Sequence, residues 1–325
     1  MPTPGTGLGS FAAFITESVY GNDPGSGYKY HRIVKSSWLP TAEYTRGNRG
    51  LGRLGVSSLR NRVKHVEGSV TIDNQYEGDE VLLLHFFGGT DTFSLNNPVS
   101  GTHTHIFSPS TTRKVGLTYH DNLVVSRAAI NGVKLNKMEW KITNENLETT
   151  FGGVGKVHAE AACDTPTFPT APDVLALDGT APAGLVAKLD TVAFNIREAS
   201  ISADFPYTTD REYLGFDAMQ EPLPQDVMSL TGELTREYED TTYSSKWIAN
   251  TKGQLDFDYQ SGAYITGTTR YKYAITLFEV VFGSARAPVE SGGVLVEKIP
   301  FKAHINSAGQ FFQVAKINAI GTAVT

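Results

Sequence analysis

Apolar and polar residues alternate with period two along several stretches of the chain, which predicts β-strands with one buried and one wet face. In residues 66–73, "VEGSVTID", the buried face would hold Val66, Val70 and Ile72. The wet face would carry Glu67, Ser69, Thr71 and Asp73. Residues 230–237, "LTGELTRE", follow the same pattern and leave on their wet face Thr231, Glu233, Thr235 and Glu237.

These two stretches belong to an internal repeat. Gly68 in "VEGSVTI" matches Gly232 in "LTGELTR", and residues 33–45 match residues 196–208 at nearly the same offset. Residues 131–142, "NGVKLNKMEWKI", match residues 292–303, "GGVLVEKIPFKA", and both change the phase of their alternation at the same point. Such a change predicts a β-bulge in each copy. Because the matches keep their order, we predict a duplicated unit.

One short helix is expected in each copy, after residues 66–73 in the first copy and after residues 230–237 in the second. "GDEVLLLHFFGG" places Asp79 and Glu80 in a first turn and Gly88 at the end. "DTTYSSKWIANTKG" begins with Thr and Ser capping candidates and would end at Gly253. The two end glycines also keep the spacing of the repeat.

The predicted fold is therefore mainly β, with two tandem β-sandwich or barrel domains that each carry one short packed α-helix. We expect an N-terminal arm at 1–27, a first repeat at 28–158, a Pro-, Ala- and Thr-rich linker at 159–190 and a second repeat at 191–325. At 325 residues the chain is long enough for each repeat to bury its own core.

Composition narrows the class of protein. The chain has 28 Lys and Arg against 34 Asp and Glu, so bulk electrostatics would not hold it on nucleic acid. Cys163 is the only cysteine, which excludes an internal disulfide. The longest apolar run, "VLLLHFF", is too short to span a bilayer, and the N-terminus lacks the pattern of a secretory signal. We expect a protein that folds in the cytosol.

His103 and His105, in "GTHTHIFSP", would project from one face of a strand and could share a metal ion. A metal site needs further ligands, and the chain offers only His85 and His120 at unknown distances. The repeat also places Tyr271 and Tyr273 near the two histidines. We therefore interpret them as ordinary strand positions, and we predict no metal and no cofactor.

Motifs of catalysis are also lacking, because the chain has no G-x-S-x-G elbow and no Walker-type phosphate loop. Gly5, Gly7 and Gly9 follow no strand and fit an arm better than a phosphate loop. Asp256 and Asp258 are spaced as the carboxylates of a glycosidase strand can be. We predict no enzyme, and a carbohydrate-binding or glycoside-hydrolysing β-sandwich is the alternative class.

The succession "GSFAAFITESVYGNDPG", "HVEGSVTIDNQYEGDEVLLLHFFGG", "HTHIFSPS" and "AAINGVKLNKMEWKI" resembles the tail tube (major tail) proteins of long-tailed bacteriophages, here in a duplicated form. The resemblance implies subunits whose inner sheets close into rings, stacked into a hollow tube that conducts double-stranded DNA without binding it specifically. If single-domain relatives form rings of six, a two-domain chain would fill the ring with three copies. It also implies a virion protein assembled in the host cytoplasm, whose partners are copies of itself, the tape measure protein, the tail terminator and distal tail or baseplate proteins, with no membrane insertion.

Two oppositely charged segments are candidate arms between subunits or rings, which would fix their register. The basic segment holds Arg46, Arg49, Arg53, Arg60, Arg62 and Lys64. The acidic segment holds Asp210, Glu212, Asp217, Glu221 and Asp226. The alternatives are that the basic segment contacts DNA or is simply solvated. We further predict that the eight wet-face residues named first line a polar to acidic channel. The alternative is that they lie on the outer surface, because alternation shows which face is polar but not where that face lies in the assembly.

Overall fold

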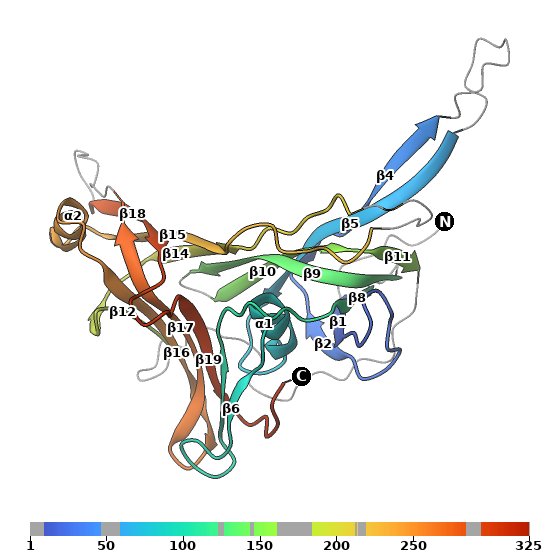
Figure 1. Cartoon of the computed structure of the whole chain (residues 1–325). Coiled ribbons are helices and arrows are strands. Elements are labelled where there is room, and N and C mark those ends of the chain that lie inside the picture. Colours follow the sequence, from blue (N-terminus) through green and yellow to red (C-terminus); the bar gives the residue numbers. More distant parts are fainter. Residues whose placement is uncertain are drawn as a thin grey trace, which may run out of the picture.

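The structure is a computed structural model that describes residues 10–46, 59–122, 127–143, 146–160, 184–211, 213, 219–283 and 294–324 (Figure 1). At residues 42–46, 59–64 and 160 it describes the backbone alone. The described residues form strands and two short helices, which confirms the prediction of a mainly β protein. Neither helix in this part of the chain is long and apolar enough to cross a membrane.

The described residues of the first half contain eleven strands and one helix. They are β1 (Phe11–Thr16), β2 (Lys29–Arg32), β3 (Lys35–Ser36), β4 (Leu39–Arg46), β5 (Leu59–Asp73), α1 (Glu80–Phe87), β6 (Thr92–Ser94), β7 (His103–Phe107), β8 (Leu117–Asn122), β9 (Arg127–Ile142), β10 (Leu147–Gly155) and β11 (Val157–Glu160). The second half contains β12 (Gly184–Leu189), β13 (Val192–Phe194), β14 (Glu198–Asp204), β15 (Ser229–Glu237), α2 (Thr242–Ile248), β16 (Gly253–Thr266), β17 (Thr269–Phe282), β18 (Val296–Ala303) and β19 (Phe312–Asn318).

Strands pair in the same order in the two halves. In the first half β1 pairs with β2 and β8, β9 pairs with β8, β10 and β11, and β5 pairs with β10. In the second half β12 pairs with β13 and β16, β17 pairs with β16, β18 and β19, and β15 pairs with β18. The hairpin of β6 and β7 has no counterpart among the described strands of the second half.

A shared close approach supports the match of Gly68 with Gly232. A Cβ at Gly68 would lie 2.6 Å from the carbonyl oxygen of Ser37, and a Cβ at Gly232 would lie 2.5 Å from that of Ser200. Each long strand therefore needs glycine at the point where the preceding strand crosses closest to it.

The match of residues 131–142 with 292–303 is wrong. By its pairing, β18 is the counterpart of β10, and the counterpart of β9 is β17. β9 has the expected bulge, opposite Gly152 and Gly153 of β10, whereas β18 pairs with β15 in unbroken register. The false phase change in β18 arises because Glu297 occupies a core position, where it accepts a hydrogen bond from Arg236 at 2.6 Å.

The expected boundaries also need correction. β1 lies inside the predicted arm, yet it pairs with β2 and β8 and buries Ala12 and Phe14. β12 lies inside the predicted linker. α1 spans the predicted helix and ends at Gly88, but α2 ends well before Gly253, which instead begins β16.

The two halves share one hydrophobic core, so the expectation of a separate core in each half is wrong. β9 of the first half pairs with β14 of the second, which joins β4, β5, β10, β9, β14, β15 and β18 into one continuous sheet. Figure 1 shows α1 on one side of this sheet, below β9 and beside β19. There Trp140 of β9 packs edge-on against Phe312 of β19.

Candidate functional site: the polar face of the sheet

Polar residues from both halves form rows across the continuous sheet, on the face opposite the core. Residues that pair directly across strands lie on the same face, so the register identifies each row. One row consists of Thr71, Thr150, Glu139, Ser202, Thr231 and Lys302. The next consists of Asp73, Glu148, Lys141, Ser200, Glu233 and Pro300. None of these twelve side chains is buried.

All eight residues predicted from the alternation lie on this face, and the core-facing Val66, Val70 and Ile72 are buried as expected. Seven of the eight are exposed or half-buried. Thr235 is the exception, because it is buried beside Glu198, whose carboxylate accepts a hydrogen bond from the threonine hydroxyl at 3.1 Å. The sequence did not identify the contributions of β9, β10, β14 and β18, although their alternation carries the same signal.

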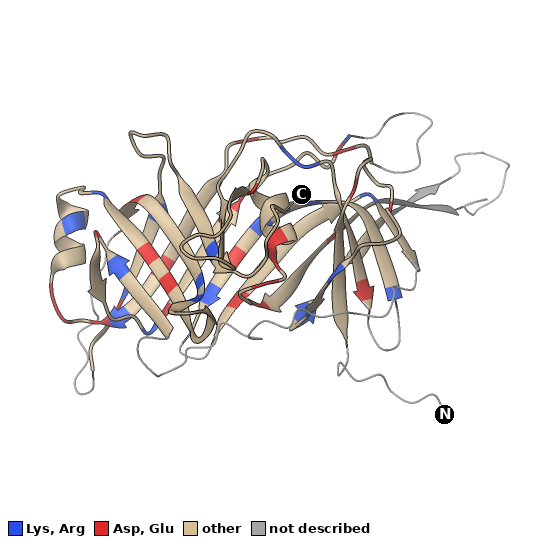
Figure 2. Ribbon diagram, turned by 90° about the horizontal axis from the view of Figure 1, so that it is seen from below, with Lys and Arg blue, Asp and Glu red and all other residues tan. Residues whose placement is uncertain are grey.

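The polar face is mixed in charge rather than simply acidic. Lys137 lies 3.2 Å from Glu139, and Lys298 lies 3.5 Å from Glu233. Lys141 stands directly opposite Glu148 on β10. Figure 2, which views the molecule from the side opposite this face, marks acidic and basic positions interspersed along the strands of both halves. Each of these lysines thus has a carboxylate beside it, which reduces its attraction for a passing phosphate.

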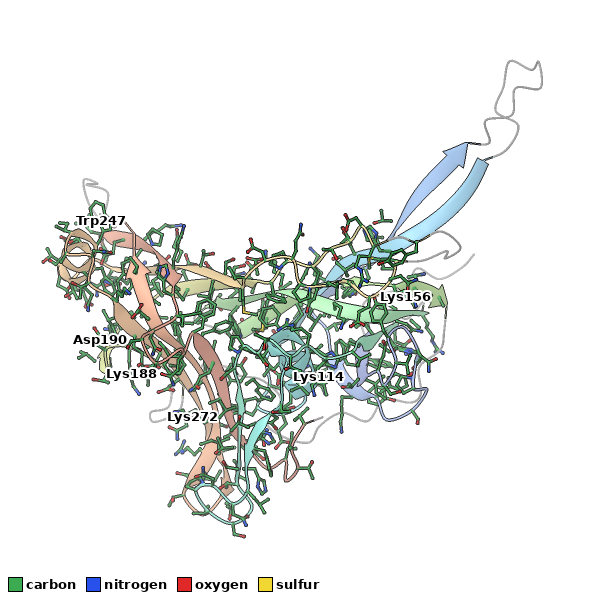
Figure 3. All side chains as sticks on the ribbon, in the orientation of Figure 1. Lys114, Lys156, Lys188, Asp190, Trp247 and Lys272 are labelled. Atoms are coloured by element: carbon green, nitrogen blue, oxygen red, sulfur yellow. The ribbon has the colours of Figure 1, made fainter. Side chains whose placement is uncertain are left out.

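A second polar face lies on the outside of β12, β16 and β17, where Figure 3 labels Lys188 and Lys272. Asp258 on β16 lies 2.8 Å from Lys188 and 3.1 Å from Lys272. Partial burial raises the pKa of Asp258, but the hydrogen bonds and charges of Lys188 and Lys272 lower it by more. The net effect is a lowered pKa, so the carboxylate stays ionised. Such a group is a poor general acid, which weakens the glycosidase alternative.

His103 and His105 lie on one face of β7, as predicted, and both are buried. Nδ1 of His105 lies 2.6 Å from the carboxylate of Asp91, and Nε2 lies 3.1 Å from the carbonyl oxygen of Ile320. Burial lowers the pKa of His105, and the hydrogen bond and charge of Asp91 raise it by more. The described residues hold no cluster of three or more metal-ligating side chains.

The match of these histidines with Tyr271 and Tyr273 is wrong as well. β7 belongs to the hairpin that has no counterpart in the second half, and it pairs with β19 instead. The histidine strand therefore ties the first half to the last strand of the chain.

The basic segment falls on a hairpin of β4 and β5 that projects from the body of the molecule (Figure 1). Its strands carry Arg46, Arg60, Arg62 and Lys64. Arg49 and Arg53 lie outside the described residues. The paired backbones of these two strands extend away from the rest of the described chain, as an arm must.

The acidic segment lies against the first half of the same chain. The backbone N–H of Phe205 donates to Asn136 at 2.7 Å, and the Arg113 side chain donates to the Tyr207 hydroxyl at 2.9 Å. Glu221 accepts a hydrogen bond from Lys134 at 2.6 Å, so this predicted arm residue already has a partner within the chain. Asp210 and Asp226 are exposed, and Glu212 and Asp217 lie outside the described residues.

Comparison with known proteins agrees with the arrangement of these parts. A family model described as phage tail tube protein matches residues 7–303, a range that includes strands of both halves. No curated protein matches the chain. The match covers well over half of the sequence, and the chain belongs to the family of phage tail tube proteins.

Proposed function

We propose that three copies of this chain close into a pseudo-hexameric ring, and that rings stack into the hollow tail tube through which genomic DNA passes. The observation that carries the proposal is the pairing of β9 with β14. It joins the two halves edge to edge, so that one chain builds a sheet of seven strands with a continuous polar face. Membership of the tail tube family supports a structural role in the virion tail.

The edges of this sheet indicate how copies would join. β14 pairs with β15 on one side and with β9 on the other, whereas its counterparts β3 and β4 pair only with β5 in the described structure. Val34 and Leu39, at this free edge, are 52% and 70% exposed. An exposed apolar strand edge can pair with a strand of another chain. In a closed ring, the edge of β3 and β4 would pair with the neighbouring copy.

The polar face is the surface that we assign to the channel. A tube lining has to continue from one half to the next, and the rows through Thr71 and Thr231 do so. The outer face of β12, β16 and β17 belongs to the second half alone. Short hydroxyl side chains and neutralised lysines would let DNA slide, because strong phosphate contacts would hold it.

The hairpin of β4 and β5 is assigned to contacts between copies. In the second half, the connection between β14 and β15 lies on the neighbouring half of the same chain. The hairpin occupies the equivalent place in the first half, and would therefore lie on a neighbouring copy or ring. Further partners follow from the family role, namely a tape measure protein during assembly, a terminator at one end and distal tail or baseplate proteins at the other.

Electron microscopy of the concentrated protein, combined with native mass spectrometry, tests the proposal. Rings and tubes whose smallest closed unit weighs three times the 35.3 kDa chain are the expected result. Dispersed single chains that bind glycans would instead support the carbohydrate-binding alternative. Closed units of another copy number would overturn the threefold ring.

A further inference from the structure

The two helices hold the same place in their halves, after β5 and after β15, but their surroundings differ. Every residue of α1 is buried. Part of its cover comes from β19 of the second half, where the ring of Phe312 packs at a tilt against that of Phe87 with ring centres 5.0 Å apart. Lys316 and Asn318 of the same strand donate hydrogen bonds to Glu80 at 2.8 and 3.0 Å. α1 is thus part of the contact between the halves.

α2 lacks such a cover within the described residues. Tyr243 is its only buried residue, while Trp247 is 46% and Ile248 78% exposed. Figure 3 shows Trp247 at the far end of the molecule from Lys156, which lies just before β11. Two large apolar side chains on the last turn of a helix are costly to leave in water, so a partner surface is expected here.

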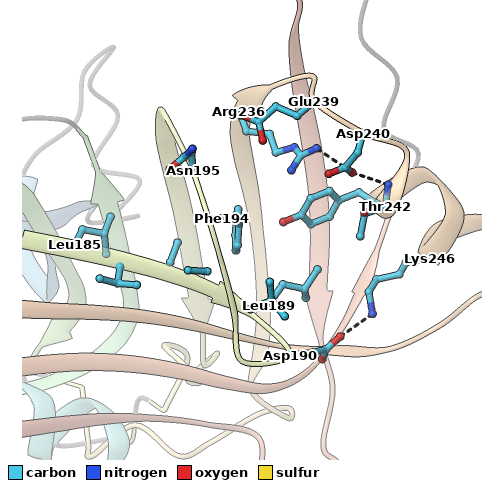
Figure 4. A pocket seen from close by; sticks show the side chains of 15 residues that line it. Leu185, Leu189, Asp190, Phe194, Asn195, Arg236, Glu239, Asp240, Thr242 and Lys246 are labelled. Carbon is cyan, nitrogen blue, oxygen red and sulfur yellow. Dashed lines mark hydrogen bonds and ion pairs between the residues drawn. The ribbon is translucent and has the colours of Figure 1, made fainter.

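A pocket lies beside α2 and is lined in part by Thr242, Tyr243 and Lys246 of that helix. It has a volume of about 580 Å³ and lies between α2, β12 and β13 (Figure 4). Leu189, Phe194 and Tyr243 supply apolar walls, and the rim carries an ion pair of Lys246 with Asp190 at 2.7 Å. Val192, on the β13 side, is 69% exposed. Arg236, Glu239 and Asp240 add charged groups to the lining, and apolar anchors surrounded by charged groups are the usual composition of a protein–protein interface.

We propose that this surface, formed by Trp247, Ile248 and the adjacent pocket, is the docking site for a second copy of the chain, which presents its first half. The contact between the two halves of one chain is the template for this contact between two copies. β19 covers α1, and the strand that corresponds to β19 by its pairing is β11 of the first half. In the described structure β11 pairs only with β9, so its other edge is free. The neighbouring copy places β11 against α2.

The chemistry of this contact differs from that of the template. At α1, Asp79 and Glu80 meet the ammonium group of Lys316. At α2 the nearest carboxylate, that of Asp240, already pairs with Arg236 of the same half at 3.2 Å and accepts a hydrogen bond from the backbone N–H of Thr242 at 2.8 Å. The contact between copies is therefore mainly apolar, and we expect it to depend on Trp247 more than on salt concentration.

A charge placed on this surface tests the inference, which rests on the proposed ring. W247D with I248S should weaken association about tenfold or more, because buried aromatic anchors dominate interface energies. At a dilution where both proteins are single chains, its thermal unfolding should match that of the wild type, since both side chains are exposed in the single chain. L95D, at a residue 59% exposed elsewhere on the surface, is the matched control and should assemble normally.

A disulfide cross-link locates the partner. In a C163S background, W247C with A159C places the two thiols at opposite ends of one chain, so a bond between them has to join two copies. Oxidation should give linked dimers and trimers on a non-reducing gel, and L95C with A159C should give none.

The outcomes separate the two proposals. A wild-type protein that forms no ring overturns the proposed function. Rings that form equally well from W247D with I248S, without any cross-link through position 247, overturn this docking site alone.

Discussion

The ammonium group of Lys316, on the last strand of the chain, lies 2.8 Å from the carboxylate of Glu80 at the start of α1. Both groups are buried, and Asp79 is a second partner of the same lysine. Burial raises the pKa of Asp79 to about 6 and the charge of Lys316 holds that of Glu80 below its usual value despite burial. One cation thus connects the second half of the chain to the helix of the first.

Lys316→Met should destabilise the protein by about 3–5 kcal/mol, because it leaves buried carboxylates without a counter-ion. Urea unfolding measures this loss. Lys272→Met, which removes a partly exposed partner of Asp258, should cost no more than about 1 kcal/mol. Adding D79N and E80Q to the Lys316 variant should recover part of the stability. No recovery would argue against electrostatics as the cause.

Gly68→Ala and Gly232→Ala should each destabilise the protein by about 1–3 kcal/mol, because the new methyl group meets the backbone of the preceding strand. Thermal or urea unfolding gives the difference. Gly152→Ala serves as the control, since the nearest atom to its Cβ would belong to the Lys137 side chain, at 3.2 Å, and the nearest backbone atom would lie 3.8 Å away. Equal stability of all three variants would contradict the close approach seen at both repeat positions.

Stability should fall as the pH drops below 6.5. Burial lowers the pKa of His31 from 6.5 to about 4 and that of His85 from 6.5 to about 3. The unfolded chain binds these protons near pH 6.5 and the folded chain does not, so each histidine costs about 1.4 kcal/mol per pH unit below that point. The loss of stability levels off once the pH falls below the pKa of each histidine in the folded chain.

Comparing melting temperatures from pH 7.5 to 5 identifies the histidines responsible. His85→Gln keeps a hydrogen-bonding group near Thr16, whose hydroxyl lies 3.0 Å from Nε2 of His85, and should flatten the pH dependence. His304→Gln, at an exposed position, should leave the slope unchanged. A slope that is the same in His85→Gln would remove His85 from the explanation.

Thiol reagents of graded size test the assignment of the polar face to the channel. In a C163S background, Thr231→Cys lies on the polar face and Lys272→Cys on the outer face of β17. In assembled tubes a small maleimide should label both, whereas a polymer-linked maleimide too large for the bore should label only position 272. Dissociated chains should be labelled at both positions by either reagent. Equal labelling of the tubes by the large reagent would place the polar face outside.

Reversing the charge of the basic segment tests the hairpin contact. Arg49→Glu with Arg53→Glu should shorten or abolish tubes, because like charges would then face each other where opposite charges met. Tube length in electron micrographs is the measurement. Lys29→Glu, an exposed change outside the hairpin, is the control. Tubes of normal length in the double variant would exclude a role of these two arginines in assembly.

The sequence by itself determined the local features of this protein. Alternation identified the buried face of β5 through Val66, Val70 and Ile72, and a glycine stop marked the end of α1 at Gly88. Gly68 and Gly232 revealed the repeat because a close backbone approach requires glycine in both copies. The strand and helix features depend on neighbours along the chain, and the repeat is visible because the same glycine recurs in the same strand pattern, so the order of residues carries both.

Only the tertiary structure decided how the halves combine. The pairing of β9 with β14, the burial of His105 beside Asp91 and the contact of Lys316 with α1 join residues that are distant in sequence. Glu297 illustrates the physical reason. A charged residue in a strand predicts a wet face, and here a distant Arg236 neutralises it inside the core, so the apparent phase of the strand was false. Polarity along the chain indicates which side chains prefer water, but only the fold supplies the partners that let a polar group stay buried.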